Sequence, residues 1–166
     1  MTKLTHAWAR IAFVVIAISV TGLATSFEAA AQESKIAAKD VPAAVIAAFK
    51  SAYPTATIKG YAREKENGKT FYEIESKDGD TGRDVLYNPD GSVAELEETI
   101  AASDLPAAAR EVIHSKYPGA VVTKAERTTE KTAQGDKVGY EVIAKQGKKR
   151  ITLEFDGDGN LKSKAK

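Results

Sequence analysis

The stretch Asp40-Val41-Pro42-Ala43-Ala44-Val45, which runs on to Tyr53-Pro54, returns later in the chain as Asp104-Leu105-Pro106-Ala107-Ala108-Ala109, which runs on to Tyr117-Pro118. Both ends of the block recur at an offset of 64 residues. A start signal, an apolar stripe and a stop signal that recur in register indicate two copies of one structural module. The fold is therefore predicted to be organised around this repeat.

Each copy of the block is typical of a short amphipathic helix. Asp40 is a candidate N-cap, and Pro42 lies in the first turn, where a missing amide hydrogen has no cost. Pro54 disfavours helical geometry at the residue before it, so the helix should end at Tyr53. The apolar positions share one helical face in each copy: Val41, Val45, Ala48, Phe49 and Ala52 in the first, and Leu105, Ala109, Val112 and Ile113 in the second.

Four strands are predicted after each helix. Those of the first copy lie at 57–66, 70–77, 83–88 and 93–99, separated by turn signals such as Asn67-Gly68 and Asp90-Gly91. Those of the second lie at 120–130, 138–145, 149–155 and 160–163. The two copies together predict an α+β fold, in which tandem helix-plus-four-strand antiparallel repeats form one continuous eight-stranded sheet with both helices on one face.

Residues 1–31 are predicted to be a signal peptide that is cleaved before Gln32. Lys3 and Arg10 form its basic start, an apolar run follows at 11–23, and three alanines at 29–31 form the cleavage site. An uncleaved anchor is the less favoured alternative, because the run is shorter than the roughly 20 residues that span a bilayer. We expect a periplasmic or secreted protein with no stable membrane insertion after cleavage. The chain has no cysteine, which excludes both disulfides and a thiol-linked lipid.

The charge balance argues against one class of partner. Cleavage would leave 22 of the 24 basic residues and 22 of the 23 acidic residues. A balanced chain lacks the basic surface that binding to phosphates demands, so nucleic acid is not an expected partner. We divide the chain into the signal peptide at 1–31, a flexible lead-in at 32–39, a first repeat at 40–102 and a second repeat at 103–166.

The repeated pattern resembles a known family. A Val-Pro-x-x-Val-x-x-x-Phe-x-x-x-Tyr-Pro block, a Tyr-Glu-Ile strand and a strand that ends at Asp-Gly, given twice, resemble the PepSY-like proteins related to the β-lactamase inhibitor protein fold. The resemblance covers nearly all of the chain after residue 31. It implies a small exported protein of tandem helix-plus-four-strand repeats, and relatives are associated with inhibiting or docking onto other proteins, commonly enzymes. No residue pattern ties this chain to β-lactamase. The association with inhibition rests on similarity of fold and not on particular site residues.

No residue set in the sequence amounts to catalytic machinery. Nucleophilic catalysis needs a base beside the nucleophile, and His114 is the only histidine after residue 31. It follows Leu105 by nine positions, which places it about 180° around the helix from the apolar stripe. We therefore expect His114 to face water, and we predict no catalytic residue, no bound cofactor and no enzyme activity.

Acidic turns are the second candidate site. The segment Asp156-Gly157-Asp158-Gly159-Asn160 begins like a calcium loop, but its twelfth position would be residue 167, so an EF-hand is excluded. We favour an ordinary hairpin turn, and no metal site is predicted. Two acidic groups are left as weak cation binders: Asp78, Asp80 and Asp84, and separately Glu95, Glu97 and Glu98.

The third candidate is the face of the sheet away from the helices. Aromatic and aliphatic side chains among charged ones are typical of an interface with a few anchors. Strand alternation assigns these residues to the protein-binding face: Tyr61, Arg63, Phe71, Glu73, Leu86, Glu141 and Ile143. A solvated face with cross-strand pairs is the alternative, and a one-residue error in register would move a strand's side chains to the other face.

From these observations we predict an exported, non-enzymatic protein-binding module that inhibits or modulates another extracytoplasmic protein of unknown identity. The alternative is a cell-envelope protein that binds a cation or a small ligand through its acidic turns.

Overall fold

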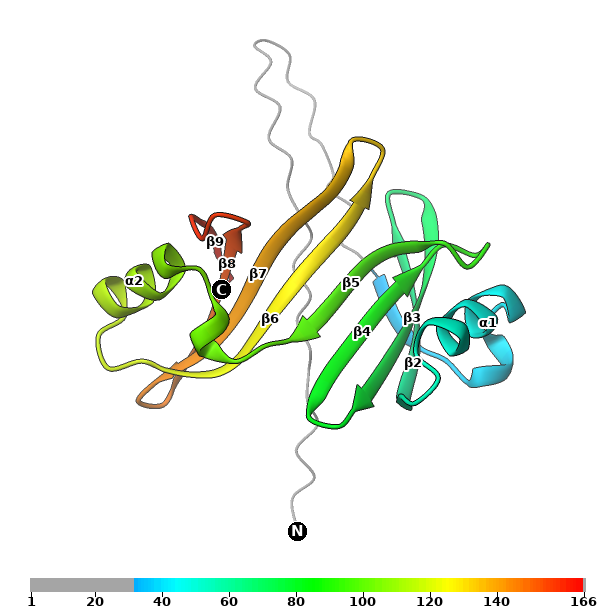
Figure 1. Ribbon diagram of the computed structural model, residues 1–166, viewed down its shortest axis with the longest axis horizontal. Helices are drawn as coiled ribbons and strands as arrows, with labels where there is room; N and C mark the ends of the chain where they lie inside the picture. Colours follow the sequence, from blue (N-terminus) through cyan, green and yellow to red (C-terminus); the bar gives the residue numbers. More distant parts are fainter. Residues whose placement is uncertain (1–31, 166) are drawn as a thin grey trace.

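The computed structural model describes residues 32–165, and the predicted signal peptide with its cleavage site lies outside them. These residues form a mixed α+β fold with one open antiparallel sheet of nine strands, in which each strand pairs with the next along the chain (Figure 1). The expected sheet had eight strands. The ninth is the first in the sequence.

The strands are β1 (Gln32–Lys35), β2 (Thr57–Glu66), β3 (Lys69–Asp78), β4 (Thr81–Tyr87), β5 (Val93–Thr99), β6 (Val121–Thr132), β7 (Gly135–Gln146), β8 (Lys149–Asp156) and β9 (Leu161–Ala165). The helices are α1 (Ala43–Ala52) and α2 (Ala107–Lys116), and each follows a short 3₁₀ turn, η1 (Ala38–Asp40) or η2 (Ala102–Asp104). Neither helix has the length and hydrophobicity of a membrane-spanning segment.

The helices end where the sequence predicts and begin slightly later. At the end of α1 the backbone amide of Tyr53 donates a hydrogen bond of 2.8 Å to the carbonyl of Phe49. Asp40, however, does not cap the helix: it lies in η1, and Pro42 is the N-cap residue. The Asp40 carboxylate instead accepts a hydrogen bond of 2.9 Å from Lys39, which lowers its pKa. The helix start is therefore set by Pro42 rather than by an acidic side chain.

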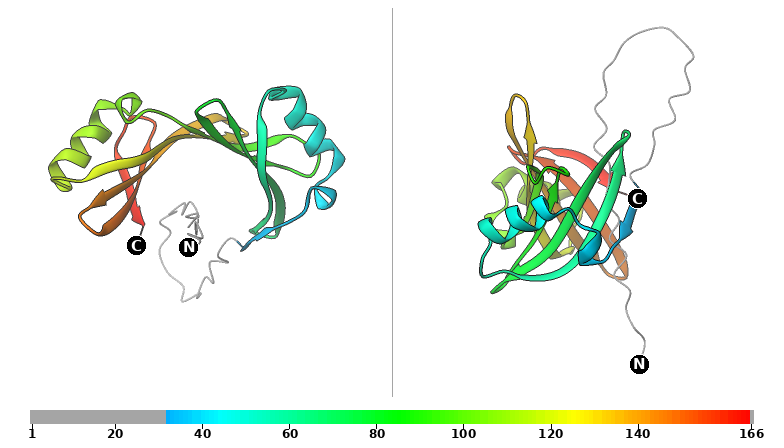
Figure 2. Two further views of the ribbon diagram at one scale, coloured as in Figure 1. Left: turned by 90° about the horizontal axis from the view of Figure 1, so that it is seen from below. Right: turned by 90° about the vertical axis from the view of Figure 1, so that its right-hand side faces the viewer.

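Each helix packs on its own half of the sheet. Val41, Val45 and Phe49 of the α1 block are buried against Ile74, Val85 and Tyr87, and the α2 block forms a second cluster with Val142, Leu153 and Phe155. Figure 2 shows both helices on the outer side of a curved sheet. The inner side of the curve carries neither helix.

The first four residues of the segment at 32–39, which was expected to be a flexible lead-in, form an edge strand. Lys35 of β1 lies opposite Ala62 of β2. Thr99 of β5 lies opposite Glu126 of β6. Each residue of the second pair follows its counterpart in the first pair by 64 residues, the offset of the repeat. Strand β1 therefore pairs with β2 in the first unit in the same way as β5 pairs with β6 in the second. Strand β5 pairs with both β4 and β6, so it joins the sheet of the first unit to that of the second.

The Asp-Gly turns hold the last hairpin of each unit against its helix. Gly91 has φ 88° and Gly159 has φ 86°, conformations that favour glycine. A Cβ on Gly91 would lie 2.8 Å from the carbonyl oxygen of Ala44, and one on Gly159 would lie 2.7 Å from the Cβ of Pro106. The turns thus require glycine for contact with the helix start as well as for backbone conformation.

Candidate binding face of the sheet

The candidate site is the inner face of the sheet, defined here as the side away from α1 and α2. Residues directly opposite each other in neighbouring antiparallel strands point to the same side, so the register assigns each side chain to a face. Glu73 lies opposite both Ala62 and Leu86, and Glu141 lies opposite both Glu126 and Glu154. Five of the seven residues predicted for the binding face lie on this inner face: Phe71, Glu73, Leu86, Glu141 and Ile143.

The other two predicted residues lie on the helix side. Tyr61 is opposite Ile74 and packs against the first core cluster, and Arg63 is opposite Tyr72. The cause is a bulge in β2 between Ile58 and Gly60, which inserts one residue and reverses the alternation beyond it. The prediction that Tyr61 and Arg63 belong to the binding face was therefore wrong. The glycine inside the strand was the sequence signal for this bulge.

Acidic side chains face one another across the inner face. Like charges directly opposite in a sheet are destabilising, so these contacts oppose the fold. Five such cross-strand pairs run from β3 to β8: Glu75 with Asp84, Asp84 with Glu97, Glu95 with Glu130, Glu126 with Glu141, and Glu141 with Glu154. The inner face therefore concentrates negative charge at its centre.

The electrostatics of Glu141 reflect this concentration. Burial raises its pKa, and the carboxylates of Glu97, Glu126 and Glu154 raise it further, while Lys124 opposes the shift, giving a value of about 7. Lys124 itself pairs with Glu126 at 2.6 Å. The raised pKa means that a negative charge on Glu141 is unfavourable beside its acidic neighbours.

Three carboxylates of the inner face converge closely enough to hold a metal ion. Asp84, Glu97 and Glu126 each offer an oxygen, and these three atoms lie within 4.8 Å of one another. They come from β4, β5 and β6, so the group unites one member of each predicted acidic set with a residue of the second repeat. Sequence reasoning missed Glu126, because its contact with Glu97 depends on pairing between the two units.

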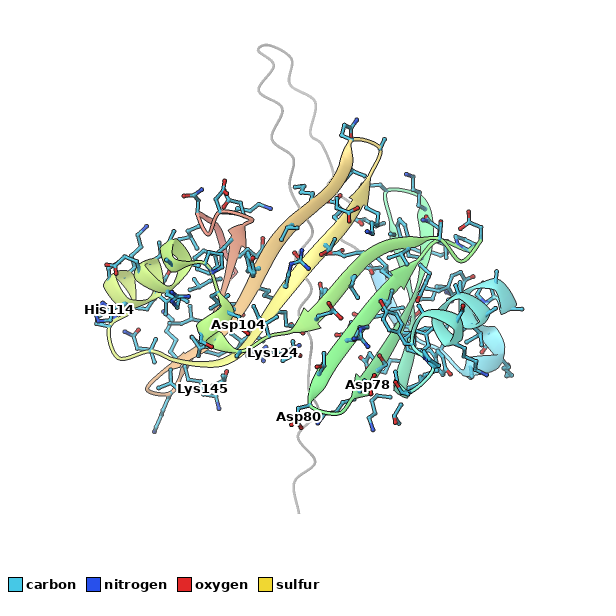
Figure 3. The ribbon with its side chains drawn as sticks, viewed as in Figure 1. Asp78, Asp80, Asp104, His114, Lys124 and Lys145 are labelled. Carbon is cyan, nitrogen blue, oxygen red and sulfur yellow. The ribbon has the colours of Figure 1, made fainter. Side chains whose placement is uncertain are left out.

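The other members of the predicted acidic sets do not belong to this group of three carboxylates. Asp78 and Asp80 are at the turn between β3 and β4 (Figure 3), where Asp78 accepts a hydrogen bond of 2.9 Å from Thr55. Glu98 points to the helix side and binds Arg83 at 2.9 Å. The Asp156 turn is a hairpin, as predicted, because its carboxylate accepts bonds from the amides of Asp158 and Asn160.

A pocket of about 430 Å³ opens on the inner face near three hairpin turns. Phe71, Leu86 and Ala94 supply its apolar lining, and Glu95 and Glu130 stand at the acidic side. Lys69, Lys131 and Lys137 also line it, and Lys137 pairs with Glu130 at 3.2 Å. Volumes of this size accommodate a small molecule or one or two side chains of a protein.

His114, the histidine that was weighed for catalysis and expected to face water, does not belong to this face. His114 lies on α2 and is exposed, as expected from its position on the helix (Figure 3). Among the described residues, the inner face combines the acidic cross-strand pairs, apolar side chains and a pocket, and it is our candidate site.

Comparisons with known proteins agree with this architecture. A family model described as beta-lactamase-inhibitor-like and PepSY-like matches residues 27–95 and 78–163. No curated protein matches the chain. The two family matches overlap across β4 and the start of β5, the region where one unit passes into the next.

Solved structures share the fold at low sequence identity. A proposed periplasmic protein of Bacteroides eggerthii is 16% identical, with a TM-score of 0.61 over 75% of this chain and 88% of the other. A BLIP-like protein of Bacteroides fragilis is 23% identical, with a TM-score of 0.53 over 75% and 85%. A DUF2874 family protein of Bacteroides ovatus is 16% identical, with a TM-score of 0.57 over 75% and 86%. Two matches of one family model across nearly all of the described residues lead to one conclusion: the chain belongs to the beta-lactamase-inhibitor-like, PepSY-like family.

Proposed function

We propose that this protein is an exported, non-enzymatic protein-binding module that inhibits or modulates another extracytoplasmic protein through its inner face. The observation that carries the proposal is the half-buried Phe71, which lies with the more deeply buried Leu86 and Ile143 among charged residues on the side of the sheet without helices. Apolar anchors within a polar surround are the usual composition of a protein interface. The anchors stand on strands, which hold them in fixed positions.

The family and the structural neighbours support the protein class and the extracytoplasmic location in this proposal. The family is described as beta-lactamase-inhibitor-like, and one neighbour is BLIP-like. Another neighbour is a proposed periplasmic protein, which agrees with the export signal predicted from the sequence. The proposal assigns this chain an extracytoplasmic location and a protein partner, but no particular target.

Affinity capture tests the proposed interface. The mature protein, immobilised and exposed to the extracytoplasmic fraction of its own source, should retain a specific partner. The variant Phe71→Ala should lose that partner, because a half-buried aromatic anchor contributes a large share of interface energy. His114→Ala, on the exposed side of α2, is the matched control and should retain it. Retention of the partner by Phe71→Ala, with an unchanged thermal melt, would contradict the proposed interface.

A second candidate function is cation binding, favoured by the convergence of Asp84, Glu97 and Glu126. Three carboxylates from three strands resemble the oxygen-rich surroundings that calcium prefers. Calcium that binds only the folded protein should raise the thermal midpoint in proportion to the logarithm of its concentration.

The variant Asp84→Asn/Glu97→Gln should abolish this rise. The variant Asp78→Asn/Asp80→Asn removes the same charge at the β3–β4 turn and should retain it. A thermal midpoint that millimolar calcium leaves unchanged would exclude the cation site.

A further inference from the structure

We infer that the partner presents a basic, extended segment to the inner face, with an apolar side chain that enters the pocket beside Phe71 and Leu86 and cationic side chains that reach the neighbouring carboxylates. This inference rests on the proposed protein-binding function and specifies the chemistry of its partner.

The cross-strand register is the first argument. Glu75, Asp84 and Glu97 lie side by side in three consecutive strands, and the row beside them contains Glu126 opposite Glu141. Each like-charged pair reduces the stability of the sheet, whereas an opposite charge at the same position would increase it. A cationic side chain of a partner would therefore be attracted to these rows.

The distribution of lysines is the second argument. Lys69, Lys77 and Lys137 of the inner face stand beside the β2–β3, β3–β4 and β6–β7 turns respectively. Lys124, which pairs with Glu126, lies closer to the centre. The acidic rows thus occupy the middle of the curve and the basic side chains its margin. An anionic partner would meet repulsion at the centre, whereas a cationic one would be attracted there.

The pocket supplies the third argument, because it lies directly beside the acidic rows. Leu86 in its lining is opposite Glu95 in β5, and Asp84, two residues earlier in β4, belongs to the carboxylate group. Residues two apart in a strand are about 7 Å apart on the same face. An extended segment with an apolar residue at one position and a basic residue two positions away matches this spacing.

A fluorescent probe peptide tests the inference on the mature chain. The probe has the order lysine, serine, leucine, serine, lysine, with both ends blocked, so that leucine and the lysines share one side. One control peptide replaces leucine with serine, and a second replaces both lysines with glutamates. Fluorescence anisotropy should show at least about tenfold tighter binding of the lysine–leucine probe than of either control, and weaker binding when salt rises from about 50 mM to about 200 mM.

Protein variants locate the binding. Asp84→Asn/Glu97→Gln should weaken binding of the lysine–leucine probe about tenfold. Leu86→Ala should reduce the advantage of that probe over the serine control. Glu111→Gln, an exposed change of the same chemistry on α2, should leave binding unaltered. Thermal melts establish that each variant is folded.

Three outcomes would overturn the inference. Equal binding of the glutamate peptide would exclude charge recognition, and equal binding of the serine control would exclude the apolar anchor. Probe binding that persists in Asp84→Asn/Glu97→Gln would place the basic segment elsewhere. If Phe71→Ala still loses a captured partner in any of these cases, the proposed binding function stands and the basic partner alone is rejected.

Discussion

The guanidinium carbon of Arg83 lies 4.1 Å from the centre of the Tyr53 ring. Tyr53 ends α1, and Arg83 stands in β4 with its Nε donating to Glu98 of β5 at 2.9 Å. One side chain therefore connects the end of the helix to two strands. In the second unit Ile151 occupies the matching place, 68 residues later, and joins the core with Tyr117. The same helix stop is held by a cation–π contact in one unit and by apolar packing in the other.

Replacing Arg83 with alanine should lower the free energy of unfolding by about 1 to 2 kcal/mol, since the variant loses a partly buried cation–π contact together with an ion pair. Urea denaturation measures the change. Lys50→Ala, an exposed basic residue on α1, should alter stability by less than about 0.5 kcal/mol. Equal effects of the two substitutions would show that Arg83 does not hold the helix end.

Replacing Gly159, in the second Asp-Gly turn, with alanine should reduce stability more than the same change at a glycine in an open turn. Gly79 also has a positive φ, 58°, but no atom lies near its missing Cβ. Gly79→Ala should therefore cost about 1 kcal/mol from backbone strain alone. Gly159→Ala should cost about 1 to 3 kcal/mol more, because its Cβ would overlap Pro106 and the amide of Ala109. Similar losses of stability in both variants would argue against close contact between the turn and α2.

The raised pKa of Glu141 predicts a pH-dependent stability. The folded protein retains a proton on Glu141 up to about pH 7, whereas the unfolded chain releases it nearer the ordinary value of 4.5. Because the folded state binds more protons in this interval, wild-type stability should fall as pH rises from 4.5 to about 7, by at most about 3 kcal/mol.

Glu141→Gln cannot ionise, so it should become more stable relative to wild type as pH increases through this interval. Unfolding free energies measured at pH 5 and pH 8 give the comparison, with Glu111→Gln as the exposed control. A constant difference between Glu141→Gln and wild type at the two pH values would show that Glu141 titrates normally.

Strand β1 should protect the edge of β2. A chain that begins at Ala37 lacks the β1 pairing and exposes the edge of β2 between Ala62 and Lys65. Exposed strand edges pair with other chains, so this variant should be less stable and should form dimers or larger species at high concentration. Size-exclusion chromatography with light scattering measures the outcome. A variant that remains monomeric with an unchanged melt would show that β1 contributes little.

Much of the fold follows from local sequence signals. The two helices, their buried stripes and most strands are predictable because the apolar periodicity, the Tyr-Pro stops and the Asp-Gly turns all act over a few residues. Strand β1 is not predictable in this way. Its four residues, Gln32–Lys35, have no apolar alternation, and the pairing that makes them a strand comes from β2, more than twenty residues away.

The site is less predictable than the fold because it depends on register. One bulge beside Gly60 moves Tyr61 and Arg63 to the helix side while leaving Phe71 and Glu73 on the inner face. The carboxylate group of Asp84, Glu97 and Glu126 requires the pairing of β5 with β6, which joins the two units. Composition indicates that acidic residues are present, but only strand pairing determines which of them meet.

The strand shared by the two units shows how the sheet could be extended by further repeats. Strand β5 completes the first unit and starts the second, and β9 pairs with β8 in the same register as β5 with β4, with the same irregularity one unit later. A further block of one helix and four strands grafted after β9 would therefore continue the sheet through contacts that the protein already contains. Its inner face would lengthen with each block, so the footprint offered to a partner could be adjusted in unit steps by design.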